Sequence, residues 1–305
     1  MTIGYVELLC FNKNQKKSMR YLLFLLFLPN VFACTQQGSA QSEQANSDVA
    51  IAQLPRATQQ NGVVDTAQAV AVKDTTPPPK PKPAFSVEYI MGKFDPAQHP
   101  DFVAVDKKYA DELGYFLRKE TYENFVKMHD AALADGIALT IISATRNFAK
   151  QKSIWEGKWT GSRLIENGTN AAKKYPDPKT RALKILEYSS MPGSSRHHWG
   201  TDVDLNDLDN YTFEQGPGKK VYDWMKKHAA EYGFCQPYSR KGESRTTGYN
   251  EEKWHWSYMP IAKKLTDLAA RTMTDDMIGG FKGSETARQI GIVEKYVLGV
   301  NGACL

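Results

Sequence analysis

The chain has 305 residues, of which 41% are hydrophobic and 24% are charged, as in a globular protein with room for one sizeable domain and additional segments. Its formal net charge is +5, but residues 1–33 carry four cations and one carboxylate, which leaves only about +2 for the remainder. The sequence has no basic cluster with interleaved aromatic residues, so charge and composition argue against a nucleic-acid partner.

Residues 1–33 are predicted to be a signal peptide of the lipoprotein type. The basic stretch 16–20 precedes an apolar run over residues 21–33, which is too short to span a bilayer comfortably and has the length of a signal-peptide core. The run ends in Val31-Phe32-Ala33-Cys34, which resembles the processing site of bacterial lipoproteins. We therefore expect an exported protein, anchored to a bacterial membrane by a lipid on Cys34 and facing the periplasm or cell wall. A cleaved secretory signal without lipid and an uncleaved anchor are the alternatives.

Residues 34–83 are rich in Gln, Ser, Ala and Thr and end in a run of prolines. Such a segment cannot bury enough apolar surface to fold, and its prolines favour extended backbone. We predict a disordered tether over residues 34–83 and a folded domain over residues 84–305. The last part of this domain, from about residue 260, is predicted to be a helical tail.

Within the domain, hydrophobic periodicity and turn residues predict helices that alternate irregularly with short strands. Helix 121–135 is expected to turn five side chains inward: Tyr122, Phe125, Met128, Ala132 and Leu133. The further predicted elements are a strand at 137–142, a helix from about Asn147, a loop over 159–178, a helix over 179–188, a turn at 191–193, a strand at 201–205, a helix over 221–232, a strand at 254–258 and two tail helices around Gly279-Gly280. This pattern favours an α+β fold with a small, mainly antiparallel sheet packed by helices.

The segment SRHHWGTDVDL, which begins at residue 195, carries the main chemical signal. In the strand predicted at its end, Val203 points one way, and Asp202 and Asp204 point the other. Gly200 permits a tight turn before this strand, which allows His197 to lie beside Asp204. An imidazole and a carboxylate are zinc-type ligands, and a catalytic zinc site needs a third protein ligand and an open position.

A third ligand is expected at His255, which follows a carboxylate, Glu252, by three residues. Three motifs in order, SxxR at 143–146, SxHxxGxxxD at 195–204 and ExWH at 252–255, resemble those of the VanY-type zinc D,D- and L,D-carboxypeptidases. This family belongs to the wider group of lysostaphin, D-Ala-D-Ala metallopeptidases and hedgehog domains. The resemblance covers about residues 125–258. It departs from the family pattern at Asp202, where alanine is usual, and at His198, where glutamine is common.

The resemblance implies one zinc ion held on the sheet by His197, Asp204 and His255. Glu252 is then the expected general base, because it is close enough in sequence to reach a water molecule at the zinc. Arg146 corresponds to the substrate-binding arginine of the family, and its planar fork suits either a carboxylate or a developing oxyanion. Further substrate contacts are expected from Ser195, Gln151 and Trp254.

Other polar residues receive supporting roles. Asp202 is expected to hold the outer nitrogen of a ligand histidine, and His198 is expected to pack beside the site or line its cleft. Cys235 and Cys304 are either a disulfide, formed in an oxidising compartment, or two separate buried thiols. Structural roles are expected for His99, His129 and His228.

The expected activity is hydrolysis of the amide before the C-terminal D-alanine of peptidoglycan stem peptides. A cell-wall endopeptidase that cuts cross-links is one alternative. A wall-binding lipoprotein without catalytic activity is another. The sequence leaves open whether the bond is of the D,D or the L,D type, and what residues 152–190 contribute.

Overall fold

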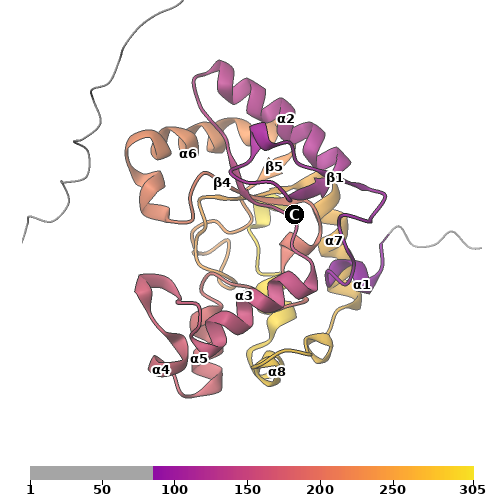
Figure 1. Cartoon of the computed structure of the whole chain (residues 1–305), viewed down its shortest axis with the longest axis vertical. Coiled ribbons are helices and arrows are strands. Elements are labelled where there is room, and N and C mark those ends of the chain that lie inside the picture. Colours follow the sequence, from indigo (N-terminus) through magenta and orange to yellow (C-terminus); the bar gives the residue numbers. More distant parts are fainter. Residues whose placement is uncertain (1–84) are drawn as a thin grey trace, which may run out of the picture. The chain divides into compact units, whose positions relative to one another are not determined.

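A computed structural model describes residues 85–305, and the statements below concern this part of the chain (Figure 1). The predicted signal peptide, the lipidation site and the tether lie outside the described residues. Among the residues that are described, no helix is long and apolar enough to cross a membrane.

A four-stranded antiparallel sheet lies at the centre of the domain, with the strand order β3-β4-β6-β5. A separate antiparallel pair is formed by β1 and β2. The α+β fold with small antiparallel sheets is therefore confirmed. The strands are β1 (Phe102–Ala104), β2 (Phe116–Arg118), β3 (Ile141–Ser143), β4 (Asp202–Leu205), β5 (Phe234–Cys235) and β6 (His255–Tyr258).

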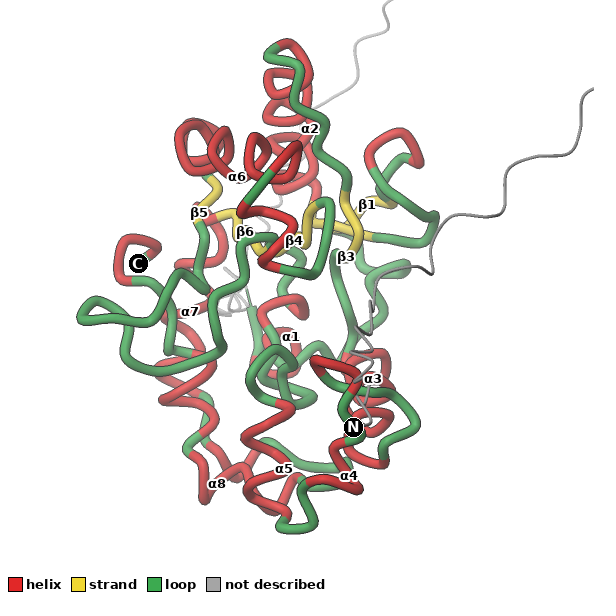
Figure 2. The backbone as a smooth tube through the Cα atoms, turned by 90° about the vertical axis from the view of Figure 1, so that its left-hand side faces the viewer, coloured by secondary structure: helices red, strands yellow, loops and turns green. Residues whose placement is uncertain are grey.

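Helices cover both sides of this sheet. Figure 2 shows α2 and α6 on one side, and α3, α5, α7 and α8 on the other. The helices are α1 (Val87–Ile90), α2 (Lys119–Ala134), α3 (Phe148–Thr160), α4 (Ala171–Lys174), α5 (Pro178–Ile185), α6 (Gly216–His228), α7 (Met259–Thr272) and α8 (Ala287–Ile290).

Local side-chain chemistry explains where two of the helices begin. The Asn147 carboxamide accepts a hydrogen bond from the Lys150 amide at 2.9 Å, which caps the first turn of α3. Asp177 caps α5 in the same way through the Thr180 amide at 2.8 Å, and Pro178 occupies the first turn, where its missing N–H costs nothing. Both starts agree with the sequence predictions.

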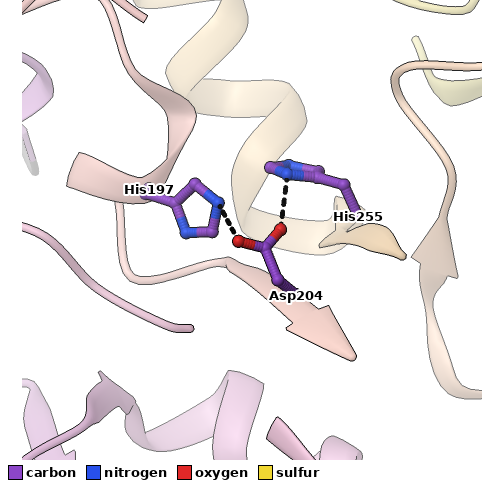
Figure 3. A group of neighbouring side chains, drawn as sticks. All are labelled: His197, Asp204 and His255. Atoms are coloured by element: carbon purple, nitrogen blue, oxygen red, sulfur yellow. Dashed lines mark ion pairs between the residues drawn. The ribbon is translucent and has the colours of Figure 1, made fainter. Parts of the chain in front are cut away.

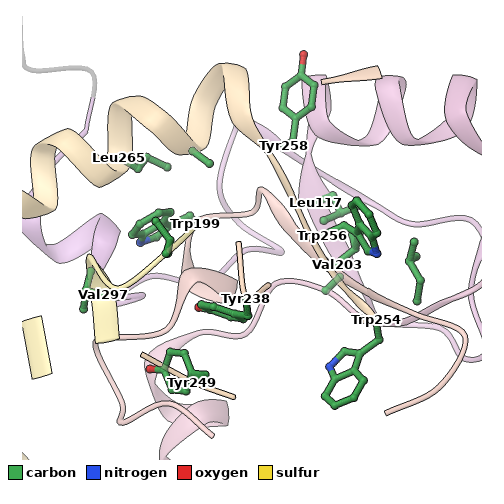
Figure 4. Packing of buried hydrophobic residues seen from close by; sticks show 14 of the residues in the cluster. Leu117, Trp199, Val203, Tyr238, Tyr249, Trp254, Trp256, Tyr258, Leu265 and Val297 are labelled. Atoms are coloured by element: carbon green, nitrogen blue, oxygen red, sulfur yellow. The ribbon is translucent and has the colours of Figure 1, made fainter. Parts of the chain in front are cut away.

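The core between the layers is largely aromatic. Figure 4 shows Trp199, Trp254, Trp256 and Tyr238 among its buried members. Val203 is fully buried on β4 and is the cross-strand partner of Trp256, as expected for the side of the strand that turns away from the metal ligands. The sheet therefore presents apolar residues to the core on one face and ligand side chains on the other.

Three predicted details are wrong. Leu133 is 57% exposed, because the inward face of α2 is centred on Phe125, Met128 and Ala132, and Leu133 lies about 100° further round the helix. The predicted loop 159–178 contains α4. The second tail helix is replaced by short pieces, which include α8 and a π-helical turn over Val293–Val297.

The strand predicted at 137–142 is also displaced, since β3 covers only Ile141–Ser143. The Asn206 carboxamide pairs instead with the backbone before β3, because its Nδ2 donates to the Ala138 carbonyl oxygen at 2.8 Å. Its Oδ1 accepts from the Thr140 amide at 3.3 Å. A side chain thus takes the hydrogen bonds that a longer strand would have made.

The C-terminal tail fastens the segment that leads to β6. Cys235 and Cys304 form a disulfide, so the first of the two alternatives for these cysteines holds. The Asn301 amide donates to the Pro237 carbonyl oxygen at 2.8 Å, and the Tyr249 and Tyr296 rings meet edge to face at 5.1 Å. The tail therefore supports the chain between β5 and β6.

Removing this disulfide should destabilise the domain. A Cys235→Ser/Cys304→Ser variant is expected to lose about 2–5 kcal/mol of unfolding free energy, because the crosslink restricts the unfolded chain. Urea denaturation measures the loss. A reductant should lower the stability of the unmodified protein by the same amount and leave the double variant unchanged; equal stability of both proteins without reductant would contradict the prediction.

Candidate metal centre

Three side chains from separate elements converge on one point. His197 lies in a 3₁₀ turn, Arg196–His198, that precedes Gly200; Asp204 lies on β4, and His255 lies directly opposite it on β6. One ligand atom from each of the three lies within 4.8 Å of the others, and all three residues are buried. Figure 3 shows both imidazole rings directed at the Asp204 carboxylate. The structure thus brings together the three predicted zinc ligands.

In each histidine, one ring nitrogen is hydrogen-bonded away from the cluster, and this bond shows which ring nitrogen faces Asp204. His197 Nδ1–H donates to the Ala144 carbonyl oxygen at 2.8 Å, so its neutral ring turns the lone pair of Nε2 towards Asp204 Oδ2, 3.3 Å away. His255 Nε2–H donates to Asp202 Oδ2 at 2.8 Å, which leaves its Nδ1 3.1 Å from Asp204 Oδ1. Two lone pairs facing one carboxylate repel unless a proton or a cation lies between them. Among residues 85–305, Asp204 Oδ1 is buried and makes no well-aligned hydrogen bond, and His255 Nδ1 is the ring nitrogen that faces it. This donor set fits a zinc ion.

Asp202 is a buried anchor for His255. Its Oδ2 lies 3.2 Å from Arg196 Nε, and its Oδ1 accepts from Ser257 Oγ at 2.7 Å and from Thr201 Oγ1 at 2.5 Å. Burial opposes the charge, but Arg196 and His255 outweigh it and hold the pKa of Asp202 below its usual value. The expected role of Asp202, to hold the outer nitrogen of a ligand histidine, is confirmed. The departure from alanine at this position thus supplies a carboxylate that orients His255.

Without a bound cation, the site lowers the pKa of one histidine and raises the pKa of the other. Burial and the nearby Arg146 guanidinium lower the pKa of His197, which keeps it neutral. Burial also opposes protonation of His255, but its hydrogen bonds to Asp202 and Asp204 prevail and raise its pKa to about 9. A metal ion must therefore displace a proton from His255, and metal affinity should fall as the pH falls.

Glu252 lies at the edge of this cluster, with Oε2 3.5 Å from His255 Nδ1. Burial raises its pKa to about 8, and the Asp204 charge adds to the increase. A cation held by the ligands would favour the ionised form of Glu252. This position is suitable for a general base beside the metal.

Arg146 is held in a defined pose at the cleft. Its Nη1 donates to Ser143 Oγ at 2.7 Å and lies 3.7 Å from Asp204 Oδ2, while its Nε donates to Gln151 Oε1 at 2.9 Å. About one fifth of its side chain is exposed, and Nη2 has no hydrogen-bond partner among residues 85–305. Arg146 therefore keeps one edge of its fork available to a ligand.

Gln151 supports Arg146 from helix α3. Its Oε1 accepts from Arg146, and its Nε2 donates to the Ser190 carbonyl oxygen at 2.8 Å. Each polar end thus makes one hydrogen bond to the protein, and Gln151 positions Arg146. Gln151 also lines the cleft, and its predicted contact with substrate stays a prediction.

The remaining predicted residues divide between the cleft and the interior. Trp254 lines the cleft. Ser195 is buried, and its Oγ has no partner within the described part of the chain, so its predicted contact with substrate stays a prediction. His198 packs in the interior, where Nδ1–H donates to the Arg146 carbonyl oxygen at 2.6 Å and Nε2 accepts from the Gly193 amide at 3.0 Å. Burial lowers the pKa of His198 to about 3, and it is not a ligand in this arrangement.

A cleft of about 560 Å³ opens from the metal centre towards residues 152–190. Several of its side chains received no role from the sequence, because no motif spacing marks them; they include Lys158, Glu166, Tyr188, Tyr238 and Tyr249. The Tyr238 ring packs against His255 with centroids 4.6 Å apart. The only sequence signal for Tyr238 and Tyr249 is that they lie shortly before the ExWH motif, within the stretch that resembles the family.

An α+β domain with two histidines, one aspartate and an adjacent glutamate in a cleft has the composition of a zinc metallopeptidase site. The family model described as "VanY: D-alanyl-D-alanine carboxypeptidase" matches residues 114–261. The resemblance seen in the motifs is thus confirmed over these residues.

Individual proteins and solved structures are similar to parts of this chain. A D-alanyl-D-alanine carboxypeptidase of Enterococcus faecalis is 29% identical over 134 residues, which are 44% of this chain; the match spans only 45% of the relative's own length. Among solved structures, VanYB in complex with D-alanine-D-alanine is 24% identical, with coverage of 57% of this chain and 86% of that one and a TM-score of 0.42. A vancomycin-resistance D,D-pentapeptidase VanY variant in complex with Zn(II) is 26% identical, with coverage of 54% and 87% and a TM-score of 0.39.

Substitution of the ligands should remove the metal. Alanine at His197, Asp204 or His255 is expected to abolish stoichiometric zinc binding, because two remaining protein ligands hold zinc poorly. Asp202→Asn should weaken zinc binding about 10- to 100-fold, since the substitution disturbs the group that orients His255. Metal analysis after dialysis and calorimetric titration measure both effects.

His228→Gln is the matched control, because this histidine lies on α6 outside the cluster and should leave zinc binding unchanged. Loss of zinc in His198→Gln combined with its retention in His197→Ala would show that the ligand assignment is wrong.

Proposed function

We propose that this protein is a zinc-dependent carboxypeptidase that removes the C-terminal D-alanine from peptidoglycan stem peptides. The observation that carries the proposal is the convergence of His197, Asp204 and His255 in a cleft that also holds Glu252 and Arg146. The match to a carboxypeptidase family model supports the reaction class. The choice between D,D and L,D bonds is part of the experiment below.

The chemistry follows from the positions of these side chains. A zinc ion held by the three ligands would polarise the scissile carbonyl and lower the pKa of a water molecule towards about 7. Glu252, as the carboxylate, accepts the proton of the attacking water and then delivers it to the leaving amine. Asp202 keeps the His255 ring in the orientation that the centre requires.

Arg146 is proposed to recognise the free terminal carboxylate. The free edge of its guanidinium offers a planar fork that matches a carboxylate, and Gln151 and Ser143 keep that fork in place. The competing role is stabilisation of the tetrahedral oxyanion. The two roles differ in their response to an amidated substrate, because only carboxylate recognition distinguishes a free from a blocked terminus.

The alternatives are a cell-wall endopeptidase and an inactive wall-binding protein. An endopeptidase must accept chain on both sides of the scissile bond, whereas an enzyme that depends on a charge pair at Arg146 rejects a continuing chain. An inactive binding protein has no need for a complete set of ligands, a base and an arginine in one cleft. The carboxypeptidase is therefore the favoured function.

Glu252→Gln should retain zinc and lose turnover by a factor of about 10² to 10⁴, which is the usual contribution of a positioned proton-transfer group. Steady-state hydrolysis of a stem peptide and metal analysis of the same preparation test this expectation. Glu251→Gln is the matched control, because Glu251 is the sequence neighbour and does not line the cleft. Normal turnover in the Glu252 variant would assign the base to another carboxylate.

Defined tetrapeptide and pentapeptide stems, with free and with amidated termini, test the proposed function itself. The unmodified enzyme should release D-alanine from a free terminus and act at least about tenfold more slowly on the amide, since a buried charge is left unmatched. Arg146→Lys should lose most activity on the free terminus, because a point charge does not reproduce the fork. Mass analysis identifies the bond that is cut. Equal rates on free and amidated stems would favour the endopeptidase.

The membrane anchor is a separate proposal that depends on residues outside the described part of the chain. The basic and apolar runs before Cys34 support lipidation at that cysteine. A Cys34→Ala variant should move from the membrane fraction to the soluble fraction of the cell envelope, as measured by fractionation and immunoblotting. Unchanged partitioning with the membrane would contradict lipid anchoring at Cys34.

A further inference from the structure

Helix α3 lines the part of the cleft that extends away from the metal centre. Three of its residues line the cleft at helical spacing, namely Gln151, Ile154 and Lys158. Gln151 contacts Arg146, and Lys158 follows it by seven residues, which corresponds to about 10 Å along the helix axis. In Figure 1, α3 lies beside α4 and α5, which belong to the segment 152–190 that the sequence left without a function.

Lys158 is a cleft cation with unused hydrogen-bonding capacity. Its side chain is only 13% exposed, and its ammonium donates to Ser189 Oγ at 2.6 Å. The nearest carboxylate oxygen, Glu166 Oε1, is 3.7 Å away, which is too far for a hydrogen bond. An ammonium has three donors, so a largely desolvated Lys158 retains donors for another acceptor.

Glu166 is the complementary anion. Its Oε2 is buried and has no hydrogen-bond partner among the described residues, an arrangement that costs free energy unless a donor arrives. The loop that carries it is closed by two backbone hydrogen bonds between Ile165 and Thr169, at 2.9 and 3.2 Å. The carboxylate is therefore presented to the cleft by a short, fixed loop.

A ligand that satisfies both groups must carry an acceptor for Lys158 and a donor for Glu166. A simple ammonium would satisfy only Glu166, and a simple carboxylate would satisfy only Lys158. An α-amino-acid head group, with an ammonium and a carboxylate on one carbon, meets both requirements within the 3.7 Å that separates the two side chains.

We propose that Lys158 and Glu166 form a zwitterion subsite, which binds a stem-peptide side chain that ends in a free amino-acid group. The inference rests on the proposed function and names the class of stem peptide that the enzyme prefers. An extended peptide covers about 10 Å in three residues, so this subsite lies within reach of a side chain one or two residues before the scissile bond. The residue bound there is a diamino diacid rather than a diamino monoacid such as lysine.

The experiment uses stem peptides that differ only in the side chain of the third residue, which is meso-diaminopimelate, its carboxamide, lysine or norleucine. The full-length zinc-loaded enzyme should hydrolyse the diaminopimelate stem with a kcat/KM at least about tenfold above that of the carboxamide and lysine stems, because one charge-assisted hydrogen bond is lost in each of these. Equal kcat/KM values for all four stems would overturn the subsite and leave the proposed function intact.

Substitution of Lys158 and of Glu166 tests the role of each residue in the subsite. Lys158→Met should remove the preference for the diaminopimelate stem over its carboxamide and over the lysine stem. Glu166→Gln should remove the preference for the diaminopimelate and lysine stems over the norleucine stem. Lys150→Met is the matched control, because Lys150 lies on α3 outside the cleft lining and should retain the full preference. A preference that survives both variants would overturn the assignment.

Calorimetric measurement of the binding of the cleaved tripeptides tests the subsite independently of catalytic activity. The tripeptide that ends in diaminopimelate should bind at least about tenfold more tightly than the one that ends in lysine, and Lys158→Met should remove the difference. If no stem peptide is hydrolysed, the proposed function fails, and this measurement still decides the subsite: equal affinities would overturn it.

Discussion

Two imidazole rings converge on a single buried carboxylate, and the rest of the structure maintains this arrangement. His197 and His255 are held in these orientations because their other ring nitrogens are bound to the Ala144 carbonyl oxygen and to Asp202. Asp204 is held in place because it lies opposite His255 in the antiparallel pairing of β4 and β6. A cation between the three groups would replace the proton of His255 and bind all three side chains.

Asp202, the carboxylate behind His255, is itself held by buried hydrogen bonds. Arg196 is buried against Asp202, and its other two nitrogens donate to Thr266 Oγ1 at 3.0 Å and to Ser257 Oγ at 2.8 Å. A buried ion pair of this kind adds little to stability, because the loss of hydration offsets the attraction. Its value here is geometric, since it fixes the carboxylate that orients His255.

Segments outside the family-matched residues 114–261 also support the site. Before that region, Tyr89 Oη donates to the Trp199 carbonyl oxygen at 2.7 Å, and Trp199 Nε1 donates to the Ile90 carbonyl oxygen at 3.0 Å. These bonds clamp the turn that carries His197 onto α1. After it, the disulfide of Cys304 with Cys235 and the bond of Asn301 fasten the chain between β5 and β6. The cooperative unit that holds the metal centre therefore extends beyond the family match on both sides.

The sequence alone predicted the candidate ligands, the candidate base and the arginine, because the spacing within each motif depends only on the local backbone of a short segment. The alternation of TDVDL predicted that Asp202 and Asp204 share one face, and the sequence also predicted a helix from about Asn147. Tertiary structure alone decided what depends on contacts between distant segments. The length of β3 was set by Asn206, which competes for its backbone, and the exposure of Leu133 was set by the direction from which the core meets α2. The tertiary fold also brought Lys158 and Glu166 together and gave Gln151 its role behind Arg146, since neither juxtaposition leaves a periodic or spaced pattern in the chain.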